Sequence, residues 1–272
     1  MRKIKGDDPV IDKLINGKDK YIFGMIHVIR EDEEAVIWTD DESCIIARSA
    51  RYPGIWVFTN DKITETSKKE AAQAISELLD GGKKKIRICV QEKSKDILSL
   101  VNEFTGLEYS LRFTFNTYAC FEKNEVAPKG EVTVPSRRSV KDLAEFIRQI
   151  LKDTENFDIS KKDARKAARR EIKANKKIKN LFIFFLKDEK KFVSMLRINK
   201  SKKYALIDTV ITKRKYRGEG YGLTLVSLAS AMMLDEGRTP VLYTDKEEGP
   251  NAFYLKAGYE KQGEFSEYRV SG

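Results

Sequence analysis

The segment that most constrains this chain lies at residues 206–222, which read LIDTVITKRKYRGEGYG. An apolar strand ends there in an arginine- and glycine-rich turn, and the apolar helix pattern LTLVSLASAMML begins directly after it. Such a helix start directs backbone N–H groups and the positive end of the helix dipole at one spot, so the turn predicts a phosphate cradle. Glycines that permit φ > 0 and cations that suit phosphate lie in this turn: Gly218, Gly220, Gly222, Arg214, Lys215 and Arg217. Taken alone, the pattern is equally compatible with a solvated basic turn that caps the helix.

The spacing of the loop separates it from two common phosphate loops. It has neither the GxxxxGK[ST] of nucleoside-triphosphate sites nor the GxGxxG of dinucleotide folds. Arg217-x-x-Gly220-x-Gly222 instead fits the R/Q-x-x-G-x-G/A pattern of the GNAT superfamily of acyl-CoA-dependent N-acyltransferases. The strand pattern TPVLYTD at 239–245 and the closing segment PNAFYLKAGYEKQGEF at 250–265 follow in the order that superfamily uses. Over about residues 180–270 the chain therefore resembles a GNAT domain.

The N-terminal half alternates predicted strands and helices, which indicates an α/β domain over residues 1–125. Strands are expected at 21–30, 33–38, 43–49, 55–59, 85–90 and 109–121. A helix is predicted over 67–82, with Ser67 as N-cap, Glu70 completing a capping box and Gly81-Gly82 as the stop. A second capped helix, over 94–106, is expected to end at Gly106.

A proline- and charge-containing stretch at 123–138 predicts a boundary, with a second domain over 126–272. That domain begins with a predicted helix from Ser139 whose apolar face is Leu143, Phe146, Ile147, Ile150 and Leu151. A basic helix and three antiparallel strands are expected before the loop. We predict an α/β fold with a mixed sheet, GNAT-like and tandem. The first domain is either a degenerate GNAT-like copy, lacking the loop, or an unrelated α/β domain.

Composition narrows the class of protein. The 272 residues contain no apolar run near 18 residues and no signal-peptide pattern, so a soluble cytoplasmic protein without membrane segments is expected. Cys44, Cys89 and Cys120 lie far apart in apolar stretches, which predicts buried free thiols and no metal site. The single histidine, His27, is expected to be a strand residue rather than a catalyst.

The positive charge is concentrated in the second domain. Residues 1–125 carry 20 basic and 22 acidic side chains, whereas residues 126–272 carry 32 and 20. Between Lys161 and Lys179, ten of nineteen residues are Lys or Arg, with a thin apolar stripe of Ala164, Ala168 and Ile172. The helix is either a plain surface helix or an electropositive rim for acyl-CoA or an acidic acceptor. Since the segment has no aromatic residue, nucleic acid is not the expected partner.

The resemblance implies how acetyl-CoA would be held as a co-substrate. The backbone of the strand before the loop would pair with the pantetheine arm, the loop amides would hold the pyrophosphate, and an asparagine of the following helix would contact the arm. Carried over residue by residue, these positions are Val210, Ile211, Thr212, Arg217, Gly218, Glu219, Gly220, Tyr221, Gly222, Leu223 and Asn251. Glu247 stands where many members have another asparagine, which puts that one contact in doubt.

The resemblance also implies direct attack of an amine on the thioester. Tyr254 matches the tyrosine that protonates the departing thiolate, although an aromatic packing role is the alternative. For the general base, Asp208 on the strand, Asp245 at the next strand end and a water chain stay open. Strand alternation is expected to keep Asp208 on the face where the base of some members lies.

The sequence thus predicts an acetyl-CoA-dependent N-acetyltransferase acting on an unidentified primary amine. A longer acyl-CoA, another phosphate ligand, and a non-catalytic acyl-CoA sensor or interaction protein are the alternatives. The first domain is expected to shape the acceptor site or a homodimer interface. The acidic stretch 245–248 would favour a cationic acceptor only if it lined the entrance.

Overall fold

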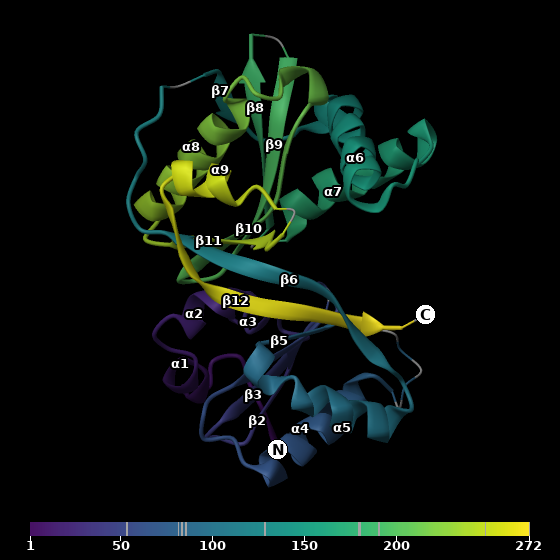
Figure 1. Cartoon of the computed structure of the whole chain (residues 1–272). Coiled ribbons are helices and arrows are strands. Elements are labelled where there is room, and N and C mark those ends of the chain that lie inside the picture. Colours follow the sequence, from purple (N-terminus) through teal and green to yellow (C-terminus); the bar gives the residue numbers. More distant parts are fainter. Residues whose placement is uncertain are drawn as a thin grey trace. The chain divides into compact units, whose positions relative to one another are not determined.

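A computed structural model describes residues 1–52, 54–80, 82, 84, 86–127, 129–178, 181–189, 191–247 and 249–271. Five residues used in the sequence predictions lie outside this described part: Gly81, Lys85, Pro128, Lys179 and Glu248. The predicted mixed α/β fold is confirmed, and the chain forms two compact units (Figure 1). Unit 1 comprises 1–119, 243–251 and 261–272, and unit 2 comprises 120–242 and 252–260.

Unit 1 contains a twisted sheet with helices on both faces. Its strands follow the order β1 (Arg2–Ile4), β2 (Val36–Thr39), β3 (Cys44–Arg48), β4 (Ile55–Thr59), β5 (Ile88–Val90), β12 (Tyr259–Val270), β6 (Tyr109–Cys120). Its helices are α1 (Val10–Leu14), α2 (Asp19–Ile22), α3 (Gly24–Ile29), α4 (Glu65–Leu78) and α5 (Asp96–Thr105), with a 3-10 turn η1 (Glu92–Ser94). The apolar runs of β3 and β4 are buried on both faces because α4 and α5 cover one side and α3 the other.

Two local predictions in unit 1 are wrong. The run 21–30, expected as a strand, forms the short helices α2 and α3, and His27 lies buried in α3. A short apolar run that is buried all round carries no periodicity that separates strand from helix. The N-cap of α4 is Thr64, whose side chain accepts a hydrogen bond from the Ser67 N–H, so Ser67 lies inside the helix. In contrast, α5 ends at Gly106 in a left-handed conformation, as predicted.

Unit 2 is built on an antiparallel meander. The strands β7 (Glu131–Thr133), β8 (Leu181–Asp188), β9 (Lys191–Lys200) and β10 (Tyr204–Thr212) pair in that order, and β11 (Thr239–Asp245) pairs parallel to β10. The helices are α6 (Val140–Glu155), α7 (Lys161–Lys177), α8 (Tyr221–Asp235) and α9 (Asn251–Lys256), with 3-10 turns η2 (Arg137–Ser139) and η3 (Arg214–Tyr216). The three predicted antiparallel strands are confirmed, while β7 lies in the stretch expected to be a boundary.

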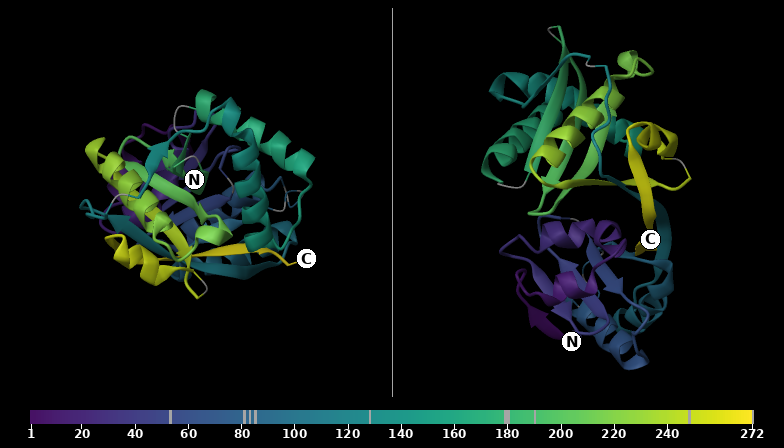
Figure 2. Two further views of the ribbon diagram at one scale, coloured as in Figure 1. Left: turned by 90° about the horizontal axis from the view of Figure 1, so that it is seen from above. Right: turned by 90° about the vertical axis from the view of Figure 1, so that its left-hand side faces the viewer.

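The two faces of the unit 2 sheet carry different helices. Figures 1 and 2 show α6 and α7 on one face and α8 on the other. Leu143 and Phe146 of α6 and the predicted stripe of α7 pack on Ile183, Phe185 and Met195 of β8 and β9. The very apolar α8 covers the opposite face of β8, β9 and β10. Burial of these faces fixes the start of α8 against the end of β10.

The two halves of the chain repeat one order of elements. In each half a strand leads through a helix to a parallel strand (β4–α4–β5 and β10–α8–β11), then to a second helix and a 12-residue final strand. This repetition supports the tandem interpretation. Residues 261–270 of β12 nevertheless belong to unit 1, so the units are not continuous in sequence. A division into domains at residues 125 and 126 stays a prediction.

Candidate active site

Strand β10 contains a β-bulge at Asp208. The antiparallel register pairs Ile207 with Ile198 and then Thr209 with Arg197, so Asp208 is an extra residue on β10. The bulge interrupts the alternation of side chains along the strand. The expectation that regular strand alternation sets the face on which Asp208 lies is therefore wrong. Bulges re-aim side chains and end pairing, and they are common beside active sites.

Parallel pairing also ends at the bulge. In the described pairings β10 contacts β11 from Tyr204 to Ile207, and beyond Ile207 it pairs only with β9. The Lys213 N–H donates to the Val193 carbonyl at 2.9 Å, and hydrogen-bonded pairs of an antiparallel ladder recur at every second residue. The peptide groups of Ile211 therefore face β9, whereas those of Val210 and Thr212 face away from it.

This orientation favours two of the three predicted pantetheine contacts over the third. The free edge of β10 presents Val210 and Thr212, and it does not favour Ile211. The Thr212 carbonyl already accepts hydrogen bonds from Gln149 Nε2 at 2.9 Å and Arg217 Nε at 3.2 Å. Val210 is thus the backbone position on this edge best suited to bind an amide-containing ligand.

The turn after β10 opens helix α8 without a side-chain cap. Gly218 and Gly220 have φ of +81° and +86°, and Gly220 is the left-handed N-cap of α8. The first intrahelical bond is donated by the Thr224 N–H to the Gly220 carbonyl at 3.0 Å. The N–H groups of the first turn, Tyr221 to Leu223, therefore have no acceptor within the helix. Three such donors at the positive end of the helix dipole suit a pyrophosphate.

Gly222 has a different role from the two left-handed glycines. A Cβ atom at this position would lie 3.1 Å from Thr212 Oγ1 and 3.6 Å from the Phe253 ring. Gly222 therefore allows the end of β10, the start of α8 and helix α9 to meet. Tyr254 lies beside this junction, since its ring centroid is 5.0 Å from that of Phe253.

The arginines of the turn help to hold the loop in place. Arg214 and Arg217 both donate to the carboxylate of Asp153 on α6, Arg214 at 2.6 Å. The Arg214 guanidinium, and after it that of Arg217, lowers the pKa of Asp153. Sequence reasoning missed Asp153 because no local pattern relates a residue of α6 to a loop sixty residues later. The Asp153 carboxylate offsets part of the positive charge of these two arginines.

The other side of the loop is held by side chains from distant segments. Lys129 Nζ donates to the Glu219 carbonyl at 2.6 Å and lies 5.5 Å from the centroid of the Tyr221 ring. The Tyr221 hydroxyl donates to Asp188 at the end of β8, and this hydrogen bond raises the pKa of Tyr221 to about 12. Glu219 therefore contributes to the loop through its backbone carbonyl. The hydroxyl of Tyr221 is hydrogen-bonded to Asp188, whereas its backbone N–H has no acceptor within α8.

Tyr254 is buried in a cluster of aromatic side chains. Only 8% of its surface is exposed, and its ring lies edge-on to Phe253 and to Tyr259. Desolvation raises the pKa of Tyr254 to about 12. The phenol is thus protonated throughout the neutral range, as a proton donor to a thiolate must be.

Asp208 belongs to an ion-pair network. Its carboxylate accepts from Arg197 Nε at 2.8 Å and from Asn199 Nδ2 at 2.8 Å, and Arg197 also contacts Glu171 of α7 at 3.3 Å. Both carboxylate oxygens have donors, so a role as base would compete with these bonds. Asp208 and α7 are connected through Arg197, which the sequence did not indicate.

The predicted cofactor residue Asn251 is engaged within unit 1. Its Oδ1 accepts from Asn116 at 2.9 Å and from the Tyr118 hydroxyl at 3.0 Å, and its Nδ2 donates to the carbonyls of Asp245 and Gly249. The amide therefore ties the loop after β11 to β6. The carboxylate of Asp245 accepts from the Glu247 N–H at 2.8 Å, as a turn residue does.

The equivalent point of the first half lacks the features that favour a phosphate. Helix α4 follows β4 as α8 follows β10, but Thr64 caps its N-terminus. The hollow beside this loop, about 670 Å³, is lined by Asp19, Glu42 and Asp61 as well as by two lysines. A capped helix start among carboxylates does not favour an anion. The two helix starts thus differ as the sequence predicted, since the first half lacks the glycine-rich loop that precedes α8.

The burial predicted for the three cysteines is confirmed. Cys44, Cys89 and Cys120 are buried free thiols, and desolvation raises the pKa of each. Within the described ranges, His, Cys, Asp and Glu side chains form no group of three suited to a metal ion. No helix in the described part of the chain has the length and apolarity needed to cross a membrane.

Comparison with known proteins identifies the fold. Residues 144–259 match the sequence profile of the Acetyltransferase (GNAT) family. No curated protein matches the chain in sequence. Among solved structures, a GCN5-related N-acetyltransferase from Sphaerobacter thermophilus superposes with a TM-score of 0.62 and 14% identity, over 100% of this chain and 96% of that one. A GCN5-related N-acetyltransferase from Kribbella flavida gives 0.59 and 9%, over 92% and 93%.

A third structure bears on the repeat. A tandem GNAT protein from the clavulanic acid biosynthesis pathway is similar over 98% of this chain and 97% of its own, with a TM-score of 0.56 and 11% identity. Identities at this level establish the fold alone. The chain contains a GNAT acetyltransferase domain over residues 144–259, and its whole length has a GNAT fold of the kind found in tandem proteins. Family and fold imply transfer of an acyl group from an acyl-CoA to an acceptor.

Proposed function

We propose that the protein is an N-acetyltransferase that moves an acetyl group from acetyl-CoA to a primary amine. The observation that supports this proposal is that three features occur together at the end of β10. A bulge, the end of parallel pairing and an uncapped helix start lie within fifteen residues of one another. A ligand with amide groups followed by a pyrophosphate, which is the chemistry of coenzyme A, fits these open backbone groups in order.

The binding residues proposed are those of the strand edge and the loop. Val210 and Thr212 would align the pantetheine, and the N–H groups of Gly218 to Leu223 would receive the pyrophosphate. Arg217 would act indirectly, because its guanidinium bonds Thr212 and Asp153 and so fixes the path of the loop. Asn251 is kept as a predicted contact, although its amide is already hydrogen-bonded within unit 1.

The reaction proposed needs positioning and two proton transfers. Acetyl-CoA supplies an activated thioester whose carbonyl carbon the amine nitrogen attacks; a C–N bond forms and the C–S bond breaks. Tyr254 is proposed to give its phenolic proton to the departing thiolate and to regain one from solvent. With a pKa raised to about 12, the donor is always loaded at neutral pH but is a weak acid. Transfer must therefore be driven by the developing charge on sulfur.

The ammonium proton of the acceptor has three possible destinations. Asp208 is the side-chain candidate on β10, but Arg197 and Asn199 occupy its oxygens. Asp245 is the second, and it serves the turn after β11. Because both carboxylates are already hydrogen-bonded, this arrangement favours solvent water as the acceptor of the ammonium proton. Replacement of Asp208 tests this choice.

Calorimetric titration with acetyl-CoA, with ATP and NAD as controls, tests binding. Micromolar affinity for acetyl-CoA alone supports the proposal, and its absence would contradict it. Release of free thiol from acetyl-CoA, measured over a panel of amines, then tests transfer. Longer acyl-CoA molecules in the same titration separate acetyl from broader specificity. Tight binding without thiol release from any amine would favour a non-catalytic sensor.

Tyr254→Phe tests the proton donor. We expect turnover to fall by about 100-fold, the usual size of a general-acid contribution, with the acetyl-CoA Kd within about twofold. Tyr259→Phe is the matched control, because its hydroxyl bonds Ser230 Oγ at 2.6 Å in the same aromatic cluster. An unchanged rate for Tyr254→Phe, or equal losses for both variants, would remove Tyr254 from this role.

A further inference from the structure

Helix α7 carries an array of cations that have no ion-pair partner among the residues that the structure describes. Nine of its seventeen residues are Lys or Arg, and all nine are exposed. Several follow one another at every fourth position: Lys161, Arg165, Arg169, Lys173 and Lys177. Like charges at this spacing repel across a helix face. A surface helix selected only for stability would alternate them with carboxylates.

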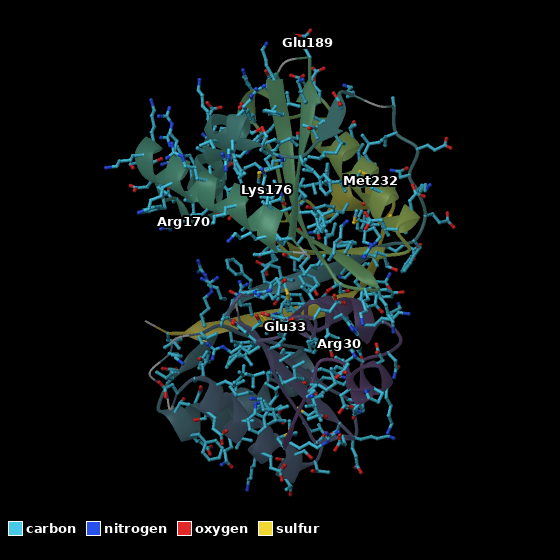
Figure 3. All side chains as sticks on the ribbon, turned by 180° about the vertical axis from the view of Figure 1, so that it is seen from behind. Arg30, Glu33, Arg170, Lys176, Glu189 and Met232 are labelled. Atoms are coloured by element: carbon cyan, nitrogen blue, oxygen red, sulfur yellow. The ribbon has the colours of Figure 1, made fainter. Side chains whose placement is uncertain are left out.

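The two acids of α7 do not relieve this repulsion. Asp163 is bonded to the N-cap Ser160, and Glu171 contacts Arg197 of β9. Across the described residues, none of the nine cations takes part in an ion pair, although the protein forms many others. In Figure 3, long side chains that end in nitrogen surround α7, where Arg170 and Lys176 are labelled.

Part of this array borders a groove with an apolar floor. The groove, of about 530 Å³, lies between α7 and the segment formed by η2 and the start of α6. Its lining consists of Arg137, Val140, Arg169, Ile172, Lys173, Lys176 and Lys177. Val140 is partly buried and Ile172 is buried, so a strip of apolar surface runs below five cations. No carboxylate belongs to this lining.

We propose that this α7 groove is a docking site for an acidic polypeptide segment that carries an aliphatic anchor residue. Charge complementarity selects a polyanion, and the apolar floor selects one with a side chain to bury. The absence of aromatic residues from α7 argues against single-stranded nucleic acid, which binds by stacking. The proposal is independent of the acetyl-transfer reaction, since none of the groove residues belongs to the loop or to β10.

Fluorescence anisotropy on the full chain tests the site with three labelled probes. These are a twelve-residue glutamate-rich peptide with one central leucine, the same peptide with serine in its place, and a twelve-nucleotide oligothymidylate. We expect the leucine peptide to bind at least about fivefold more tightly than the serine peptide, as burial of one aliphatic side chain predicts. Affinity should fall as salt is raised.

Two double variants on the same helix separate the groove from diffuse charge. Arg169→Glu with Lys173→Glu alters the groove lining, whereas Lys166→Glu with Arg170→Glu makes the same charge change, at the same spacing, outside it. We expect the first to weaken the leucine peptide at least about tenfold and the second less than threefold. Circular dichroism checks that both remain folded.

Equal affinity for the leucine and serine peptides would overturn the proposal, because the apolar floor would then have no part. Equal losses in the two double variants would reduce the site to general electrostatic attraction. Tighter binding of the oligothymidylate would assign the array to nucleic acid instead. Failure of the peptides to bind at low salt would overturn it outright.

Discussion

Replacement of Gly220 by alanine isolates the conformational requirement of the phosphate loop. Gly220 has φ of +86°, and a Cβ atom there would have Lys129 Nζ, at 3.9 Å, as its nearest neighbour. The substitution therefore creates no clash, and its cost is that of a left-handed L-residue, about 1–2 kcal/mol. Gly237 at the other end of α8 is the matched control, since its φ is +72° and no atom lies within 4 Å.

Gly237→Ala should lower Tm by about 2–8 °C, and Gly220→Ala should lower it less, because its loop can relax out of the left-handed conformation when no ligand is bound. Only Gly220→Ala should alter ligand binding. If the free loop relaxes out of the left-handed conformation, acetyl-CoA must restore it, and the apparent Kd rises by about 5- to 30-fold. Calorimetric titration of both variants alongside thermal unfolding measures the two effects separately. An equal change in Kd for both, or none for Gly220→Ala, would refute the cradle.

Three further substitutions probe the surroundings of the site. Asp208→Asn should reduce the rate of acetyl transfer less than about tenfold, because Arg197 already engages the carboxylate. A loss near 100-fold, with an altered acid limb in the pH–rate profile, would instead assign Asp208 as the general base. Asp153→Asn should weaken acetyl-CoA binding several-fold by releasing the arginines of the loop. The lowered pKa of Asp153 means that its contribution to stability, present above about pH 3.9, is lost as pH falls through the folded value, and acid unfolding of the variant should lack this component. Thr64→Ala should cost about 1 kcal/mol through loss of the α4 cap and leave acetyl-CoA affinity unchanged; a weaker affinity would give the capped loop a role in binding.

The residues of the phosphate loop could be found from the sequence because they act locally. Gly218 and Gly220 are needed where the backbone is left-handed, and the apolar run that follows can only form a buried helix. The three antiparallel strands were likewise evident from short apolar runs separated by charged turns. The buried stripe of α7 followed from its 3.6-residue period.

Other residues acquired their roles only through partners distant in the chain. Arg217 and Arg214, expected to face phosphate, are held by Asp153. The amide of Asn251, expected to contact the cofactor, is used by Asn116 and Tyr118. Neither pairing leaves a trace in the neighbouring sequence, since the partners come from other helices and strands.

The sequence by itself determined the strand–loop–helix unit, the order of elements around it and the place of excess charge on α7. These depend on backbone preference and hydrophobic period, which are properties of adjacent residues. Only the tertiary structure decided the bulge at Asp208, the end of pairing at Ile207, and the helical state of residues 19–29. Register, burial and ion pairing depend on which distant surfaces meet, and a short segment can satisfy more than one such arrangement until the rest of the chain packs against it.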